Sequence, residues 1–389
     1  MRTLKLQAST NGSKNDGYSI NMNGKDRLLD SAGKKLKDFP DSNGEFTSKN
    51  DATLVLDGLD SSASVLTVSG VGAWNTTKTL VVKGDAEALD GKDLVINNIV
   101  HAKVDLAHHN GGLTKTDVNV TVDGVKRADI DTGKGDDVVE VGILTNNATW
   151  SRNFDINTRD GNDTIILRDA SADSYSDAGL IESGRHSSVE VNSGRGDDVV
   201  IVNTQLENAS IKAGRGDDRI EINAEVSGEF EIKAGRGDDH VTMYADAELA
   251  NGADVSLGRG NDTFEGGNAA DTVSGGRGDD LFVYNSFEAA AGDVVRGGRG
   301  EDTVQLHGTV ADYSVAAEAN GWFDFTITSL DAHIEVRNVE LFRFDNGTDA
   351  TDDDIVMTLQ EVLDYNAAIS VSASTDFTDT SLEVSVDLA

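Results

Sequence analysis

Residues 258–284 read GRGNDTFEG, GNAADTVSG and GRGDDLFVY, three nine-residue units that each join a glycine-containing turn to a short apolar run. The units place Asp262, Asp271 and Asp280 nine residues apart. A repeat at a fixed period predicts an architecture in which one small unit stacks on copies of itself. This stretch therefore decides the fold class, and the sequence on both sides extends the same unit.

The turn Gly-x-Gly-Asp/Asn/Glu-Asp recurs along the chain, with eight copies between residues 133 and 302. The final aspartates from Asp198 to Asp302 are separated by 20, 21, 23, 18 and 22 residues. The copies are GKGDD at 133–137, DGND at 160–163 (with Arg159 at the first glycine position), GRGDD at 194–198, 214–218 and 235–239, GRGND at 258–262, GRGDD at 276–280 and GRGED at 298–302.

Short alternating runs flank each turn, such as Val189-Glu190-Val191 before one copy and Val199–Val202 after it. A period of two with β-branched residues predicts short strands with one buried face. At about 3.3 Å per residue, the repeat length suits one coil of two short strands and two turns. Coils of one length stack about 4.8 Å apart. The predicted fold class is therefore all-β, a right-handed parallel β-solenoid (β-roll or β-helix).

A glycine turn that ends in a carboxylate has the composition of an oxygen-ligand calcium site. Calcium accepts roughly six to eight oxygen ligands in flexible geometry, and stacked carbonyls and carboxylates supply them. Glycine is needed because the turn must adopt positive φ and let backbone oxygens converge. The sequence therefore predicts several Ca²⁺ ions as the cofactor.

The nonapeptides of 258–284 resemble G-G-x-G-x-D-x-U-x, the RTX (repeats-in-toxin) repeat, and the resemblance covers roughly residues 129–350. It implies that each ion sits between two successive turns, held by the motif aspartate and by carbonyls of the glycines and the residue between them. The candidate metal ligands carried over in this way are Gly133, Lys134, Gly135, Asp137, Gly161, Asp163, Gly194, Arg195, Gly196, Asp198, Gly214, Arg215, Gly216, Asp218, Gly235, Arg236, Gly237, Asp239, Gly258, Arg259, Gly260, Asp262, Asp271, Gly276, Arg277, Gly278, Asp280, Asp293, Gly298, Arg299, Gly300 and Asp302.

The chain departs from the RTX pattern in two ways. Thr132, Ser193, Ala213 and Leu257 stand where the first glycine belongs, and most spacings are near 20 rather than nine. We interpret this as one calcium-binding edge per coil, with both edges binding only near 258–302, where Asp271 and Asp293 lie. The 35 residues between Asp163 and Asp198 predict an insertion or an unliganded coil over 168–186.

Composition agrees with a fold that depends on cations. The chain of 389 residues has 69 acidic and 33 basic residues, a net charge of −36 and a pI near 4.3. Such a chain repels itself and resists compaction until cations bind, so that binding energy becomes folding energy. The absence of cysteine excludes a disulfide scaffold.

The sequence divides into five predicted segments: a polar N-terminal arm at 1–50, metal-free solenoid coils at 51–128, the calcium-binding solenoid at 129–310, a C-terminal β cap at 311–350 and a tail at 351–389. In the metal-free part, short strands are expected at 54–56, 65–68, 80–82, 94–96, 104–106 and 118–122. The tail is expected to be a secretion signal or an assembly segment, with a helix over Ile355–Asn366.

The start of the chain has no apolar core of a secretory signal, and no run of residues is apolar enough for a membrane helix. The RTX resemblance implies type I secretion, which reads an uncleaved C-terminal segment such as 355–389. The expected location is therefore extracellular or at the cell surface, after export without a cleaved N-terminal signal.

No catalytic motif was found: the sequence contains neither H-E-x-x-H nor G-x-S-x-G. The arginines of the repeats are expected to be offset by neighbouring acids such as Asp197, Asp217 and Asp238. We read the Arg-Gly-Asp triplets as a by-product of the repeat rather than as an integrin motif.

RTX regions accompany proteases, lipases, epimerases, adhesins and surface-layer proteins, and the repeat alone does not choose among them. Because residues 1–128 are short for an enzyme domain, the leading interpretation is a secreted calcium-dependent structural protein of a surface layer, extracellular filament or matrix adhesin. Its expected partners are further copies of itself in sheets or filaments, and a surface polysaccharide; nucleic acid and a membrane span are not expected.

Two other interpretations stay open. One is a polysaccharide-acting enzyme, an epimerase or lyase, with candidate residues around Trp74, Asp105, His108 and His109. A basic residue paired with carboxylates along one solenoid face would favour it. The other is a passive calcium buffer or accessory module, which would remain monomeric at high calcium.

Overall fold

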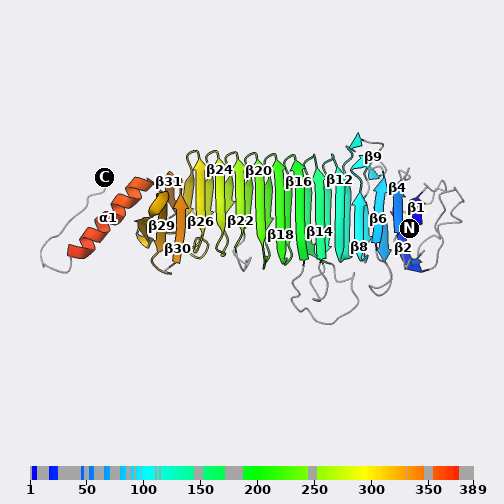
Figure 1. Cartoon of the computed structure of the whole chain (residues 1–389), viewed down its shortest axis with the longest axis horizontal. Helices are drawn as coiled ribbons and strands as arrows, with labels where there is room; N and C mark the ends of the chain where they lie inside the picture. Colours follow the sequence, from blue (N-terminus) through cyan, green and yellow to red (C-terminus); the bar gives the residue numbers. More distant parts are fainter. Residues whose placement is uncertain are drawn as a thin grey trace, which may run out of the picture.

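The computed structural model describes residues 2–6, 17–24, 45–47, 52–56, 65–70, 79–84, 89–91, 93–97, 99–109, 112–113, 115–143, 152–170, 187–243, 252–330, 332–345 and 354–375. Within these residues the chain is a β-solenoid of two long sheets, each with fifteen strands. The strands run across the long axis, and residues 2–6 and 359–375 lie at opposite ends (Figure 1). The predicted all-β solenoid is confirmed.

One sheet, here called sheet A, carries the strands that lead into the Gly-Asp turns. In spatial order its strands are β1 (Arg2–Leu6), β4 (Ala52–Leu56), β6 (Thr79–Gly84), β8 (His101–Asp105), β12 (Arg127–Gly133), β14 (Arg152–Arg159), β16 (Ser187–Arg195), β18 (Asn208–Arg215), β20 (Phe230–Arg236), β22 (Asp254–Arg259), β24 (Thr272–Arg277), β26 (Val294–Arg299), β30 (Ala332–Arg337), β29 (Trp322–Ile327) and β28 (Tyr313–Ala317).

The other sheet, sheet B, carries the strands that leave those turns. Its strands in spatial order are β3 (Glu45–Thr47), β2 (Gly17–Gly24), β5 (Val65–Gly70), β7 (Asp93–Asn97), β11 (Asn119–Val125), β13 (Val138–Ile143), β15 (Thr164–Asp169), β17 (Val199–Asn203), β19 (Arg219–Ile222), β21 (His240–Met243), β23 (Thr263–Glu265), β25 (Leu281–Tyr284), β27 (Thr303–Leu306), β31 (Leu341–Phe344) and β32 (Ile355–Thr358).

Neighbouring strands within the repeats are parallel, and each repeat contributes one strand to each sheet. In sheet A, Val191 of β16 lies opposite Ile211 of β18. In sheet B, Val200 of β17 lies opposite Ile220 of β19. These side chains are fully buried between the sheets, so the alternation of the sequence places one apolar column on each inner face.

Two edges join the sheets. We call the edge made of 134–137, 160–163, 196–198, 216–218, 237–239, 260–262, 278–280 and 300–302 the Gly-Asp edge, because each of these turns leads from sheet A to sheet B. The opposite edge, where the chain returns from sheet B to sheet A, is the return edge. The core between them is aliphatic at first and aromatic toward the C-terminal end, where Phe264, Phe282 and Tyr284 are buried.

The strands expected before residue 128 are present and alternate between the two sheets as half-coils of the same solenoid. Residues 1–50 were expected to be a polar arm, yet β1, β2 and β3 pair into the sheets there. In β1, Leu4 and Leu6 lie in register with Leu54 and Leu56 of β4. The same alternation of leucines therefore specifies strand pairing inside an otherwise polar segment.

The long gap between Asp163 and Asp198 is an insertion at the return edge. β14 pairs directly with β16, and β15 pairs directly with β17. No further coil therefore separates them, and the unliganded-coil alternative for 168–186 is wrong. Residues 171–186 themselves lie outside the described part of the chain.

At the C-terminal end the parallel stack gives way to antiparallel strands. β29 pairs antiparallel with β28 and β30, and β32 pairs antiparallel with β31. A short 3-10 turn, Val310–Asp312, precedes β28, and a second one, Ala319–Gly321, connects β28 to β29. The parallel stack therefore gives way to antiparallel strands within 311–350, the segment predicted to be a cap.

A single helix, α1 (Leu359–Thr375), follows β32 and extends beyond the sheets (Figure 1). The helix predicted from Ile355 begins four residues later, because Ile355–Thr358 pair with β31 as a strand. Thr358 and Glu361 exchange hydrogen bonds at the start of α1, the Thr358 backbone N–H donating to the Glu361 carboxylate over 2.8 Å. In the described part of the chain, no helix has both the length and the apolar character needed to cross a membrane. Away from the sheets, β9 (His108–His109) and β10 (Gly112–Leu113) form a small antiparallel hairpin.

Candidate metal centre

The turns of the Gly-Asp edge stack so closely that only glycine fits. Gly194 and Gly196 have φ of 108° and 121°, and Gly214 and Gly216 have φ of 118° and 123°. A Cβ on Gly216 would lie 2.1 Å from the carbonyl oxygen of Gly196 in the preceding coil. The glycine signature therefore reflects both a left-handed conformation and the contact of one turn with the next.

The last aspartate of each turn binds the preceding coil. The Asp218 Oδ1 accepts a hydrogen bond from the backbone N–H of Asp198 over 2.9 Å, and Asp239 Oδ1 accepts one from Asp218 over 2.9 Å. The same bond recurs in every described turn of this edge. We call these residues the inner ladder: Asp137, Asp163, Asp198, Asp218, Asp239, Asp262, Asp280 and Asp302.

The second oxygen of each inner-ladder carboxylate is buried without a hydrogen-bond partner in the described part of the chain. Asp271 and Asp293 on the return edge have the same orphaned Oδ2. Burying an uncompensated carboxylate oxygen costs several kcal/mol, so native proteins supply a proton or a cation. An array of such oxygens on successive coils is the arrangement that a chain of cations would satisfy.

The pKa values of these carboxyl groups are all raised from the usual 3.8, chiefly because they are buried. Repulsion from the charges of neighbouring carboxylates adds to the effect for most of them. Burial raises the pKa of Asp163, Asp262 and Asp302 to about 6, of Asp137, Asp218, Asp271 and Asp280 to about 7, and of Asp198, Asp239 and Asp293 to about 8. A bound cation would favour the ionised form and reverse this shift.

These donors fit calcium, provided that backbone oxygens complete the ligand set. In the described residues no three acidic, histidine or cysteine side chains converge on one point, so side chains alone do not form a cage. The inner-ladder Oδ2 atoms and the stacked glycine carbonyls are hard oxygen donors, which calcium prefers. The Arg carbonyls are less available, because Arg215 O already accepts the Gly196 N–H over 2.7 Å and the next coils repeat this bond.

The return edge carries a shorter version of the ladder. The Asp271 Oδ1 accepts the backbone N–H of Ala253 over 2.7 Å, and Asp293 Oδ1 accepts that of Asp271 over 2.7 Å. Tyr284 is fully buried, and burial together with the Asp293 charge raises the pKa of its hydroxyl well above the usual range. Asp271 and Asp293 therefore lie together on the edge opposite the inner ladder, and calcium binding by both edges in this region stays a prediction.

A second ladder, not foreseen from the sequence, runs along the exposed rim of the Gly-Asp edge. The Asp197 Oδ1 accepts the N–H of Asp217 over 2.9 Å, and Asp217 Oδ1 accepts that of Asp238 over 2.8 Å. This outer ladder consists of Asp117, Asp136, Asn162, Asp197, Asp217, Asp238, Asn261 and Asp279. The signal was the restriction of the fourth turn position to Asp, Asn or Glu, all of which have an acceptor oxygen. Because Asn serves as well, this position needs the acceptor rather than the charge.

Each ladder has a defined end. At the N-terminal end the Asp137 Oδ1 accepts the N–H of Val118, whose side chain has no acceptor to continue the ladder. At the C-terminal end the N–H of Asp302 donates to Glu340 Oε2 over 2.9 Å, so a glutamate of the cap replaces the next aspartate. The turn Asn338–Glu340, with Asn338 at φ 52°, thus closes the stack without a glycine. Sequence reasoning had placed a cap here but had not identified Glu340.

The residues between the paired glycines lie at the surface. Arg195, Arg215, Arg236, Arg259, Arg277 and Arg299 are exposed and aligned coil on coil. Lys134 instead forms an ion pair with Asp160 over 2.6 Å. The expected neutralisation by Asp197, Asp217 and Asp238 is absent from the ion pairs of the described residues; only Arg195 approaches a carboxylate, Asp160, at 3.8 Å.

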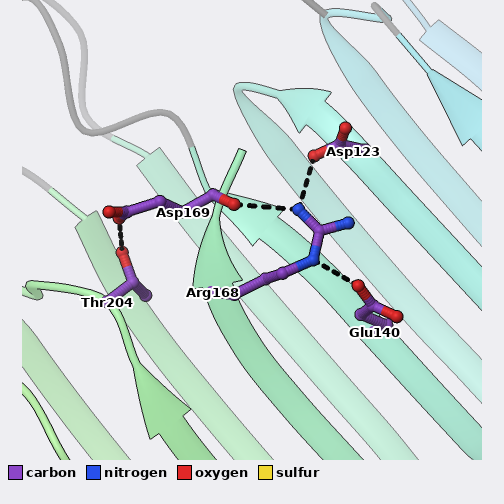
Figure 2. A network of polar contacts seen from close by, with 5 residues as sticks. All are labelled: Asp123, Glu140, Arg168, Asp169 and Thr204. Atoms are coloured by element: carbon purple, nitrogen blue, oxygen red, sulfur yellow. Dashed lines mark hydrogen bonds and ion pairs between the residues drawn. The ribbon is translucent and has the colours of Figure 1, made fainter. Parts of the chain in front are cut away.

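A polar network lies on the outer face of sheet B, where the metal-free coils meet the first Gly-Asp turns. Gly142 stands in register between Asp123 and Arg168, and a Cβ there would lie 1.8 Å from Asp123 Oδ1. Figure 2 shows that Arg168 reaches across this gap to Asp123, at 3.1 Å, and also contacts Glu140. Asp123 is only 4% exposed, so this pairing compensates a buried charge.

The structure brings together few of the residues named for the enzyme interpretation. Trp74 lies outside the described residues, and only the backbone of His108 and His109 is described. Asp105 lies on β8, in register with Asp131 of β12. The nearest histidine pairing in the described part of β8 is His101 with Asp129, at 3.1 Å.

Comparison with known proteins agrees with this geometry. Residues 254–284 match the model of the RTX calcium-binding nonapeptide repeat, in four copies. None of the curated proteins and none of the solved structures matches the chain. The matched residues contain Asp262, Asp271 and Asp280, whose Oδ2 atoms are orphaned in both edges of the stack. The nonapeptide match over residues 254–284, the parallel stacking and the buried carboxylate ladder together support an RTX β-roll protein.

Proposed function

We propose that this chain is a secreted structural protein that folds on binding calcium and forms a surface layer, an extracellular filament or a matrix adhesin. The single observation that carries the proposal is the inner ladder, in which eight buried carboxylates each keep one oxygen without a partner. In a chain of net charge −36, such a ladder is stable only when cations or protons neutralise it.

Calcium is scarce inside cells and abundant outside. A chain whose coils stack only when the ions bind would stay loose during export and fold afterwards. RTX repeats are typical of secreted proteins. Within this proposal, 129–310 is the calcium-binding part, 51–128 continues it without metal, and 351–389 serves in type I export or in assembly.

Calcium stoichiometry tests the role of the inner ladder. Replacing Asp218 and Asp239 with Asn keeps the hydrogen-bond acceptor but removes two buried charges. We expect isothermal titration calorimetry to show about two fewer ions, one per carboxylate removed. The matched control is Asp217→Asn with Asp238→Asn in the outer ladder, which changes the net charge equally and should bind as many ions as the native protein. Equal losses in both variants would contradict the assignment.

Electron microscopy tests the structural role. Purified protein in millimolar calcium should form ordered sheets or filaments that disappear in chelator. Single short rods in calcium would exclude self-assembly and would leave a calcium-folded binding module. Because circular dichroism reports folding in the same samples, a failure to assemble is separable from a failure to fold.

One observation favours a second candidate, an enzyme acting on acidic polysaccharides. On the outer face of sheet A, basic residues pair with carboxylates: His101 with Asp129 at 3.1 Å, and Arg159 with Asp131 at 2.5 Å. Burial and the neighbouring charges of Glu190 and Asp129 raise the pKa of Asp155 on the same face. Incubation with uronate polymers should then produce unsaturated or epimerised sugars, detected by ultraviolet absorbance and NMR; unchanged polymers would exclude this candidate.

A further inference from the structure

Six arginines form a continuous column along the rim of the Gly-Asp edge. Strand register pairs Arg195 with Arg215, Arg236 with Arg259, Arg259 with Arg277, and Arg277 with Arg299. The column is continuous between Arg215 and Arg236, because the Gly216 N–H donates to the Arg236 carbonyl over 2.8 Å. Successive coils of a parallel sheet repeat about every 4.8 Å, so the backbones of the column repeat at that distance.

Almost none of the positive charge of the column is neutralised by ion pairs with carboxylates of the described residues. Within the described residues, Arg215, Arg236, Arg259, Arg277 and Arg299 form no ion pair, and Arg195 only approaches Asp160 at 3.8 Å. Among the described residues, the nearest acids in sequence keep their charge but form no ion pair with the column. Asp197 and Asp217 each accept a backbone N–H from the next coil, over 2.9 and 2.8 Å. Like charges in adjacent strands destabilise a sheet, so this arrangement costs free energy in the isolated protein.

We propose that the arginine column binds a linear anionic polysaccharide that lies along the solenoid. A guanidinium group is a planar, permanently charged donor that matches carboxylate, sulfate and phosphate groups. A column of them at a constant repeat fits a chain that carries its charges at a constant repeat. One sugar unit of an extended polysaccharide advances by a length close to the distance between coils, so successive acidic sugars meet successive arginines.

The chemistry of the rim disfavours nucleic acid. Proteins that hold single strands stack bases on aromatic side chains, and the turns GRGDD, GRGND and GRGED contain none. The phosphates of a duplex strand repeat about every 3.4 Å, which does not match the coil repeat. Guanidinium groups without neighbouring aromatic side chains suit a polymer that is recognised through its anionic groups.

Calcium strengthens the same surface. The inner ladder lies directly beside the column, because each turn carries its arginine three residues before its buried aspartate, as in Arg215 and Asp218. When calcium neutralises these carboxylates, the positive potential of the rim rises. The inference therefore rests on the proposed calcium-dependent fold, and its test must show that the protein is folded before binding is measured.

The test compares two variants with the same charge change in the folded, calcium-loaded full chain. The first replaces Arg215, Arg236 and Arg259 with Gln. The matched control replaces Lys212, Arg219 and Lys233 with Gln, which lie on the sheet faces of the same coils in ion pairs with Glu190, Glu221 and Glu231. Circular dichroism in the same buffer establishes folding, so that loss of binding is not mistaken for loss of the fold.

Binding is measured by fluorescence anisotropy with labelled chondroitin sulfate oligosaccharides, at several salt concentrations. The native protein should bind with an affinity that falls steeply with salt. The rim variant should bind about tenfold more weakly. The slope of its log affinity against log salt should fall by about three, one per lost contact. The control should stay within about twofold of the native protein, as expected for surface charges away from the contact.

Four results would overturn the proposal. Equal losses in the rim variant and the control would show that net charge alone acts. Equal binding of neutral dextran would remove the electrostatic basis. Tighter binding of an oligothymidylate than of the glycan would reassign the column to nucleic acid. Sedimentation without glycan tests whether the arginines instead contact a second copy of the chain. In that case the rim variant alone would lose self-association, and the glycan would not bind the native protein.

Discussion

At the scale of single residues, the aspartate that ends each turn has two separate tasks. Its Oδ1 accepts a backbone N–H of the preceding coil, as Asp218 does from Asp198 over 2.9 Å. Its Oδ2 is buried and has no partner among the described residues. The first task makes coils stack, whereas the second makes the stack depend on a cation or a proton. Asparagine can perform the first task but not the second, as Asn162 and Asn261 illustrate in the outer ladder.

The raised pKa values predict an unusual dependence on pH for the metal-free chain. In the folded state the inner-ladder carboxyls have pKa values of about 6 to about 8, against an ordinary 3.8. The stabilisation from their protonation is fully present below pH 3.8 and is lost as the pH rises through 6 to 8. Thermal unfolding of calcium-free protein, followed by circular dichroism, should therefore show a higher Tm near pH 5 than near pH 8.

Calcium should reverse this dependence, because protons and calcium compete for the same oxygens and calcium affinity falls at low pH. The Asp218→Asn, Asp239→Asn protein is the informative control. Without calcium it should lose part of the pH dependence, whereas Asp217→Asn with Asp238→Asn should keep it. A metal-free Tm that rises from pH 5 to pH 8 would contradict protonation of the inner ladder.

At the scale of elements, the calcium-binding coils need terminators, since a stack of identical turns leaves an unsatisfied N–H at its end. β30 and β31 provide one by placing Glu340 where the next aspartate would stand. At the other end, the network of Asp123, Glu140 and Arg168 joins the metal-free strands to the first Gly-Asp turns (Figure 2). The first feature ends the inner ladder by a direct protein contact, and the second joins neighbouring coils in the same way.

The cap makes a specific prediction. Glu340→Ala removes the acceptor for the buried N–H of Asp302, and should lower the free energy of unfolding by about 1–3 kcal/mol. Denaturant unfolding in saturating calcium measures this loss. Glu340→Gln keeps an acceptor oxygen and is expected to recover most of the stability. If the two variants were equally destabilised, the charge rather than the hydrogen bond would hold the end of the stack.

At the scale of the whole molecule, the solenoid consists of parts that differ in their dependence on metal. The strands β6, β7, β8, β11 and β12 contain a fully buried apolar core, with residues such as Leu80, Ile96 and Val122. The repeats from β16 to β27 contain a core of similar type but also carry most of the inner ladder. Since each coil contacts mainly its neighbours, loss of the ions should act locally before it acts globally.

Hydrogen exchange in chelator checks this expectation. Amides of β16 to β27 should lose protection by orders of magnitude, while those of β6 to β11 should retain more of theirs. The calcium-loaded protein supplies the reference for both regions. Simultaneous and equal loss of protection along the chain would instead indicate a single cooperative unit.

Much of the fold followed from the sequence because its signals are local. Alternation of apolar residues predicted strands such as 80–82 and 94–96, and the fixed repeat of Gly-x-Gly-Asp/Asn/Glu-Asp predicted stacked coils of one length. The same repeat placed Asp262 and Asp280 on one edge and Asp271 on the other. These features depend on residues close together in the chain, so periodicity is sufficient to find them.

The tertiary structure alone decided the features that depend on contacts between coils. Only stacking showed that β1 to β3 join the sheets, that β15 pairs directly with β17, that Glu340 ends the inner ladder, and that Arg168 crosses Gly142 to reach Asp123. In the structure, Asp197 and Asp217 also accept backbone N–H groups of the next coil instead of pairing with arginines. Most of the arginine column therefore has no ion pair among the described residues. The physical reason is that a solenoid brings together residues about one coil apart in the sequence. The register of the strands, rather than the local sequence, then decides which of two neighbouring groups accepts a hydrogen bond.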